Sequence, residues 1–151
     1  MSVSTEELVL PVNELYLPIR PDYADFNVDV NQGFNWEGIY GVHRIPIGSD
    51  DVTFTFRSQE RQGVDKDLLR KLDVEALLAA EGAEGFRVYQ PFEAFSYCIW
   101  GSQELARAGI SSKAHRNAAQ YADQAYERWE LNCWKAGKSA LTGNFELIKI
   151  R

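Results

Sequence analysis

Residues 52–56 alternate strictly between an apolar side chain and threonine, which is the pattern of a strand with one apolar face. A short polar segment, residues 48–51, separates this run from an earlier apolar stretch. Two strand-like runs joined by a short polar turn predict a β-hairpin over about residues 38–57. We expect the threonines on one face of the hairpin and, on its buried face, Ile45, Ile47, Val52, Phe54 and Phe56.

Helical and strand-like patterns follow the hairpin. Asp65 is a favourable N-cap and Gly82 a favourable C-terminal stop, so the leucines between them predict a helix over about residues 65–81. We also expect strands at about residues 85–90 and 144–150, and helices at about residues 91–108 and 111–136. Because the hairpin requires antiparallel pairing, and helices and strands neither alternate strictly nor segregate, the predicted class is α+β. The expected architecture is a small, mainly antiparallel sheet with the helices packed on one face.

The first 35 residues differ in character from the rest of the chain. Prolines interrupt short apolar runs there, and acidic side chains alternate imperfectly with apolar ones over residues 22–30. These features predict that residues 1–35 form an extended acidic arm rather than a long helix. A length of 151 residues suits one domain, so we expect the arm to belong to the same α+β domain as residues 36–151.

The charge is negative and unevenly distributed. The net charge is −6, and residues 1–60 carry ten acidic and three basic side chains. An acidic chain repels phosphate groups, so we expect no nucleic-acid partner. The sequence has no apolar run long enough to span a bilayer, and its N-terminus is acidic where a secretory signal is basic. These features predict a cytoplasmic protein with no membrane partner.

Residues that commonly bind metals or act as nucleophiles are few and scattered. Neither His43 nor His115 has a ligand-type residue three or four positions away, and Cys98 and Cys133 form no CxxC motif. The sequence also lacks a GxSxG nucleophile elbow and a phosphate-binding glycine loop. We therefore expect no metal, no cofactor and no catalytic residue, which favours a protein that is not an enzyme.

The first functional hypothesis is a non-enzymatic protein-binding module. Such a protein could be an assembly subunit or a small acidic inhibitor or immunity-type protein, and its partner another protein or a second copy of this chain. The hypothesis rests on the acidic arm and on the lack of catalytic motifs. The predicted contact residues are Tyr16, Asp22, Tyr23, Asp25, Phe26, Asp29 and Trp36.

The alternative hypothesis is a small-molecule-binding protein or a hydrolase with an aromatic pocket. The chain contains 8 Phe, 7 Tyr and 4 Trp residues, and several of them lie in segments expected to pack where the sheet meets the long helix. Such a pocket would place the two histidines near a cysteine and large aromatic rings. Its candidate residues are His43, Tyr97, Cys98, Trp100, His115 and Trp129.

Overall fold

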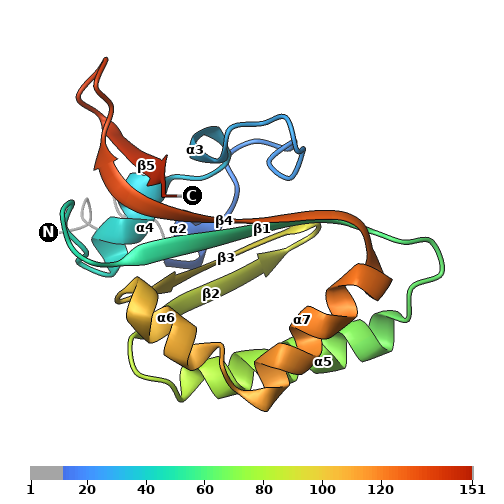
Figure 1. The fold of residues 1–151 in the computed structure, drawn as a ribbon. Coiled ribbons are helices and arrows are strands. Elements are labelled where there is room, and N and C mark those ends of the chain that lie inside the picture. The colour runs from blue at the N-terminus through green and yellow to red at the C-terminus, as the bar shows by residue number, and fades with distance from the viewer. Residues whose placement is uncertain (1–11, 151) are drawn as a thin grey trace, which may run out of the picture. The chain divides into compact units, whose positions relative to one another are not determined.

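Five strands form an antiparallel sheet in the computed structural model, which describes residues 12–150 (Figure 1). The strands are β1 (Val52–Glu60), β2 (Phe86–Phe92), β3 (Phe95–Trp100), β4 (Tyr126–Lys138) and β5 (Phe145–Lys149). Their order across the sheet is β2-β3-β1-β4-β5. Because β1 pairs with both β3 and β4, Phe54 lies opposite Cys98 on one side and Cys133 on the other.

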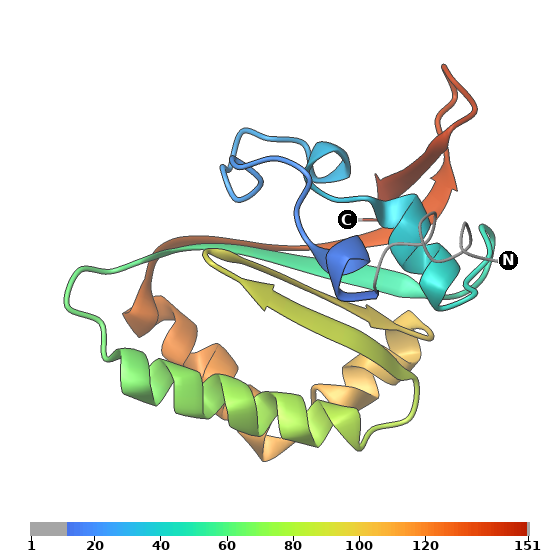
Figure 2. The same ribbon diagram turned by 180° about the vertical axis from the view of Figure 1, so that it is seen from behind.

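Three helices cover one face of this sheet (Figures 1 and 2). They are α5 (Lys66–Glu81), α6 (Gln103–Gly109) and α7 (Lys113–Ala125). Each begins after a polar N-cap whose side chain accepts a hydrogen bond from the backbone N–H three residues later, which satisfies one of the unpaired donors of the first turn. The N-caps are Asp65, Ser102 and Ser112.

The order β1-α5-β2-β3-α7-β4, with α6 just before α7, gives a split βαβ arrangement of the ferredoxin-like kind. The predicted class is therefore confirmed: the protein is α+β, with an antiparallel sheet and helices on one face. The helix predicted at 65–81 corresponds to α5, and the strands predicted at 85–90 and 144–150 correspond to β2 and β5.

The chain divides into two compact units. The sheet–helix unit contains residues 50–135 and 148–150, and the N-terminal unit contains residues 12–49 and 136–147. In the sheet–helix unit, a cluster of buried residues joins the sheet to α5 and α6 and forms the hydrophobic core. Its members are Val52, Ala80, Trp100, Ala106 and Cys133.

The hairpin predicted over residues 38–57 is wrong. Its first half is the helix α4 (Trp36–Val42), which begins after Asn35, whose side chain accepts a hydrogen bond from the Gly38 N–H. A local cap and the turns of α4 thus replace the expected pairing, and β1 pairs instead with β3 and β4. The tight hairpin of the fold is formed by β2 and β3, with only Glu93 and Ala94 between them.

The helix predicted at 91–108 is also wrong, because its first ten residues belong to β2, β3 and the turn between them. Pro91 suggested the first turn of a helix, but it lies in β2 at the edge of the sheet, where its missing N–H costs little ladder pairing. Only the end of the predicted span is helical, as α6.

The helix predicted at 111–136 is too long. It ends at Ala125, and the chain continues directly into β4. Pairing of β4 with β1 outweighs the helical spacing of the small residues, which continues as far as Cys133.

The alternation predicted for β1 is present, but the more deeply buried face is the one with the threonines. Thr53 and Thr55 are 0% and 2% exposed, whereas Phe54 and Phe56 are only partly buried. The threonines pair across the sheet with Ile99 and Tyr97, and the Trp134 indole donates a hydrogen bond of 2.9 Å to the Thr55 hydroxyl. The two phenylalanines project instead toward the helices.

The N-terminal unit contains α4 and two shorter helices, α2 (Val12–Tyr16) and α3 (Val30–Gly33). Residues 12–35 are therefore not extended throughout, and residues 1–11 of the predicted arm lie outside the described residues. The Trp36 indole donates to the Val30 carbonyl at 2.9 Å, and both side chains are buried. That the arm and residues 36–151 share one domain stays a prediction.

Candidate functional site

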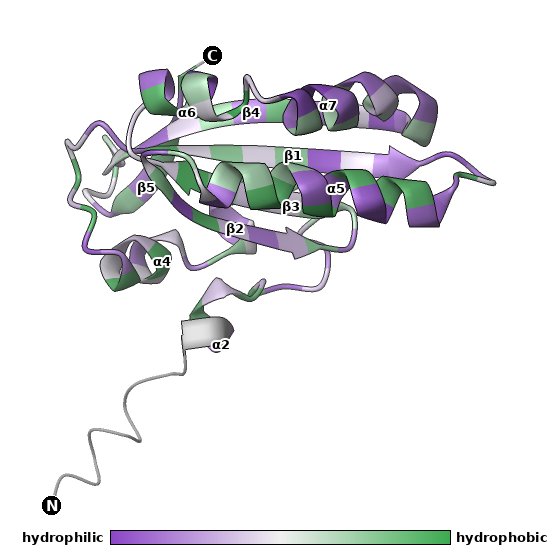
Figure 3. Cartoon of the chain, turned by 90° about the horizontal axis from the view of Figure 1, so that it is seen from below, coloured by the Kyte–Doolittle hydropathy of each residue, from purple (hydrophilic) through white to green (hydrophobic). Residues whose placement is uncertain are grey.

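A cavity of about 270 Å³ lies in the sheet–helix unit, between the helix-facing side of the sheet and the helices α5 and α7. Figure 3 shows the two helices lying across this face. Most of the lining is apolar and comes from all the surrounding elements. The apolar side chains are Phe54, Phe56, Leu69, Ala76, Leu77, Ala80, Phe86, Trp100, Ile110, Ala118, Ala119, Ala122, Trp129 and Leu131.

Alanines on the two helices leave the space that the cavity occupies. Ala118 and Ala122 of α7 and Ala76 of α5 line the cavity, where larger side chains would fill the space. The sequence suggests that such an alanine stripe allows close packing. The helices do pack against each other, but toward the sheet the short side chains leave an open volume.

Aromatic rings form the sheet side of the cavity. The rings of Phe86 and Trp100 meet edge to face with centroids 5.4 Å apart. Phe56 lies 5.4 Å from Tyr126 and 5.7 Å from Trp129, again between ring centroids. Ring pairs at these separations stabilise each other, which favours this arrangement of the wall.

Polar groups gather at one part of the lining. Asp73 of α5 acts electrostatically on Tyr89 of β2 and on Tyr126 of β4, and all three residues line the cavity. Tyr89 also forms a side-chain hydrogen bond with Ser96 of β3. Burial and the Asp73 charge raise the pKa of Tyr89 to about 12, and burial chiefly raises that of Tyr126. Both phenols are therefore neutral hydrogen-bonding groups near pH 7.

Asp73 lies at the rim of the cavity and keeps contact with water. Partial loss of hydration against the apolar lining, with a further contribution from the negative charge of Glu60, raises its pKa to about 6. The carboxyl group is thus mostly ionised at pH 7 and close to the range in which it could exchange a proton.

The other ionisable residues of the lining are held in neutral form. Burial raises the pKa of the Cys98 thiol to about 12, so the thiolate needed for nucleophilic attack is scarce at pH 7. Burial lowers the pKa of His115, which favours the uncharged imidazole. His115 sits in the first turn of α7, where its backbone N–H donates to Ser112.

Five of the six candidate pocket residues border this cavity: Tyr97, Cys98, Trp100, His115 and Trp129. The alternation of β3 directs the Tyr97 ring to the opposite face, where its centroid lies 6.0 Å from that of Phe92. His43 is not among the lining residues. It follows α4 in the N-terminal unit, and its Nε2 is 2.8 Å from the Tyr16 hydroxyl.

The candidate pocket residues do not include Asp73, Tyr89 or Tyr126, which also line the cavity. For Asp73 a signal was present, because it lies four residues after Leu69 and four before Leu77 and so falls on the inward face of an otherwise apolar helix stripe. The tyrosines carry no comparable signal, since only the pairing of β2 with β3 and the end of α7 at Ala125 bring them to the cavity.

The residues predicted to contact a partner protein make contacts within the N-terminal unit. Tyr16 and Trp36 are buried, and the rings of Tyr23 and Phe34 meet edge to face at 5.8 Å. Phe26 is partly buried, and Asp29 caps α3 by accepting a hydrogen bond from the Asn31 N–H.

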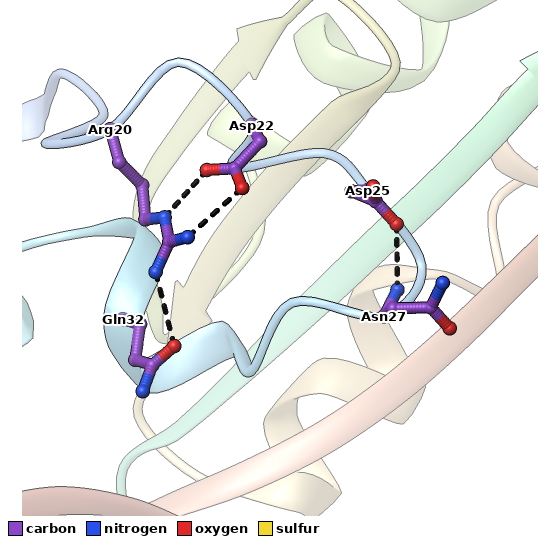
Figure 4. A network of polar contacts seen from close by, with 5 residues as sticks. All are labelled: Arg20, Asp22, Asp25, Asn27 and Gln32. Atoms are coloured by element: carbon purple, nitrogen blue, oxygen red, sulfur yellow. Dashed lines mark hydrogen bonds and ion pairs between the residues drawn. The ribbon is translucent and has the colours of Figure 1, made fainter.

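The two remaining acids of that prediction lie in a network of polar contacts on the same unit (Figure 4). Arg20 forms a two-pronged ion pair with Asp22 and also donates to Gln32 at 3.1 Å. Asp25 accepts a hydrogen bond of 2.9 Å from the Asn27 backbone. Asp22 and Asp25 therefore accept hydrogen bonds from donor groups of their own segment.

Within residues 12–150, no cluster of three histidine, cysteine, aspartate or glutamate side chains is arranged to hold a metal ion. In the same range, no helix combines the length and the apolar character needed to cross a lipid bilayer.

The sequence matches the model of a known protein family. A model of the PB2B2.08-like family matches residues 5–146, which is nearly the whole chain. The chain belongs to the PB2B2.08-like family. No curated protein matches the sequence significantly.

Solved structures share the fold at low sequence identity. Rv0793 from Mycobacterium tuberculosis is 14% identical with a TM-score of 0.50, over 60% of this chain and 98% of that one. SO0527 from Shewanella oneidensis is 9% identical with a TM-score of 0.50, over 68% and 97%. SnoaB, a cofactor-independent oxygenase from Streptomyces nogalater, is 13% identical with a TM-score of 0.48, over 61% and 98%. At such identities the similarity to Rv0793 and SO0527 shows the α+β fold alone.

The prediction of a protein-binding module is wrong. The aromatic anchors assigned to a partner, Tyr16 and Trp36, are buried within their own unit, and the acids beside them bind local groups. The sheet–helix unit instead carries an apolar cavity between the sheet and the helices α5 and α7. These findings favour the alternative hypothesis, a small-molecule site.

Proposed function

We propose that this protein binds a small apolar molecule in the cavity between the sheet and the helices α5 and α7. The observation that carries the proposal is the cavity itself, with its aromatic wall and few convergent polar groups. Ligand sites have this composition, with volumes of roughly 300–1,000 Å³. A volume of about 270 Å³ lies just below this range and suits a molecule of one or two fused rings.

Binding fits the polar groups of the cavity better than nucleophilic hydrolysis does. The Cys98 thiol is kept protonated by burial, and the Ser96 side chain is hydrogen-bonded to Tyr89 rather than to a histidine. Tyr89 and Tyr126 can orient a ligand through hydrogen bonds, while the apolar lining provides most of the affinity by removing ligand surface from water.

The proposal is tested by titrating the protein with naphthalenemethanol, a neutral fused-ring alcohol, in a calorimeter. We expect saturable binding, and we expect Ala122→Leu to weaken it by roughly tenfold or more, because the larger side chain extends into the cavity. Gln120→Leu is the matched control, since Gln120 is exposed on the same helix and does not line the cavity. Absence of binding, or equal loss in both variants, would show that the cavity is not the site.

A further inference from the structure

The polar part of the cavity carries negative charge. Asp73 is the acid of the lining, and Glu60, at the end of β1, acts on it electrostatically. Glu60 in turn pairs with Lys66, whose ammonium lies 3.7 Å away and is largely exposed to water. Among the described lining residues there is no lysine or arginine. An anionic ligand at this end would face Asp73 without a compensating cation.

The hydrogen-bonding groups around Asp73 are arranged for a ligand that donates. The Asp73 carboxylate only accepts hydrogen bonds, and the Tyr89 and Tyr126 hydroxyls can accept as well as donate. Asp73 comes from the helix side of the cavity, and the two tyrosines come from different strands. A donor group at this part of the cavity therefore has acceptor oxygens available on α5, β2 and β4.

The rim position of Asp73 matters for a charged ligand. A fully buried ammonium would lose its hydration at a cost of several kcal/mol, which one ion pair seldom offsets. Asp73 remains in contact with water, so an ammonium beside it could stay partly hydrated while the attached rings enter the apolar part of the cavity.

These observations deepen the proposed function and depend on it. We infer that the cavity selects apolar amines: ring molecules that carry a protonated amino group, with Asp73 as the residue that determines this specificity by pairing with the ammonium at the rim. Neutral molecules of the same shape bind more weakly, and carboxylates bind most weakly of all.

Three probes with the same ring test the inference: naphthylmethylamine, naphthalenemethanol and naphthoate. They are titrated calorimetrically into the full chain at about pH 8, where Asp73 is ionised and the amine is protonated. We expect the amine to bind roughly five- to tenfold more tightly than the alcohol, which is the range for a partly exposed charge pair, and the carboxylate to bind less tightly than the alcohol.

Asp73→Asn is expected to abolish the preference for the amine, so that the amine and the alcohol bind this variant with affinities within about twofold of each other. Glu75→Gln is the matched control, because Glu75 is an exposed acid on the same helix that does not line the cavity. This control should keep the preference, as should Asp73→Glu, which restores the carboxylate.

The outcomes separate the inference from the function on which it rests. If the alcohol binds and the amine binds no more tightly, the amine specificity is overturned and the binding function stands. If Asp73→Asn and Glu75→Gln reduce the preference equally, or if Asp73→Asn also loses the alcohol, Asp73 is not the specificity residue. If none of the probes binds to the cavity, both the inference and the proposed function fail.

Discussion

Asp73 is a carboxyl group in a place where the folded protein prefers the neutral form. Its pKa is raised from 3.8 to about 6, first by partial loss of hydration and then by the charge of Glu60. Between about pH 4 and about pH 6 the folded chain therefore binds more protons at Asp73 than the unfolded chain does. The contribution of Asp73 to the free energy of unfolding therefore falls as the pH rises from about 4 to about 6.

Replacing Asp73 by asparagine should remove this unfavourable contribution. We expect Asp73→Asn to melt about one to two degrees higher than the natural protein near pH 7, and at the same temperature near pH 4, where the natural side chain is also uncharged. The effect is small because the group is partly hydrated. Thermal unfolding followed by circular dichroism at the two values of pH measures it. An equal shift at both would mean that charge at Asp73 is not the cause.

Residue identity alone pointed to part of the site. Cys98, Trp100, His115 and Trp129 were found because thiol, imidazole and indole groups are rare and chemically distinct. His43 was wrongly grouped with them, because its chemistry says nothing about the unit of the fold in which it lies. The candidate residues do not include Tyr89, since its place depends on the register between two strands, which no single residue encodes.

At the scale of elements, α6 and β3 approach each other closely at Gly109. A Cβ atom added to this glycine would overlap the ring of Trp100, which is buried and also lines the cavity. The absence of a side chain at Gly109 thus permits α6 to lie against the indole.

Gly109→Ala should therefore destabilise the protein by about 1–3 kcal/mol, as overpacking of a filled core does. Gly41→Ala is the control, because a Cβ at Gly41 of α4 meets nothing within 4 Å and alanine favours a helix. Urea unfolding of both variants gives the comparison. If Gly109→Ala is as stable as Gly41→Ala, the helix and the ring are not in close contact.

Elements were predictable where a local signal agreed with the tertiary structure. In α5 the Asp65 cap, the leucine spacing and the stop at Gly82 all indicate the same helix, so the predicted span of 65–81 nearly matches the observed one. In β3, residues 95–100 are apolar enough to suit either a buried strand or a helix, and the hairpin with β2 decides between them. In β4 the small residues and Trp129 keep helical spacing after Ala125, and pairing with β1 overrides it.

At the scale of the molecule, Asn31 joins parts of the chain that are far apart in sequence. Its side-chain amide donates to the Leu147 carbonyl at 2.9 Å and its side-chain oxygen accepts from the Leu147 N–H at 2.7 Å. The two residues are 116 positions apart, both in the N-terminal unit, and Leu147 is 2% exposed. The amide thus completes the backbone hydrogen bonding of a buried position as another strand would.

Asn31→Ala should lower the free energy of unfolding by about 1–3 kcal/mol, because it leaves buried backbone groups of Leu147 without these bonds. Asn27→Ala is the matched control. Asn27 is exposed, and the contact shown for it in Figure 4 uses its backbone N–H, so its loss should change stability by less than about 0.5 kcal/mol. Equal stability of the two variants in urea would contradict the role given to Asn31.

The span between Asn31 and Leu147 also bears on how the protein is made. A ribosome adds roughly 5–20 residues per second, so Leu147 follows Asn31 by on the order of ten seconds. During that interval the nascent N-terminal segment, with Phe34 and Trp36, is without the later segment that completes its unit. Aromatic surface that is buried in the folded unit then stays open to chaperones until the segment with Leu147 has been synthesised.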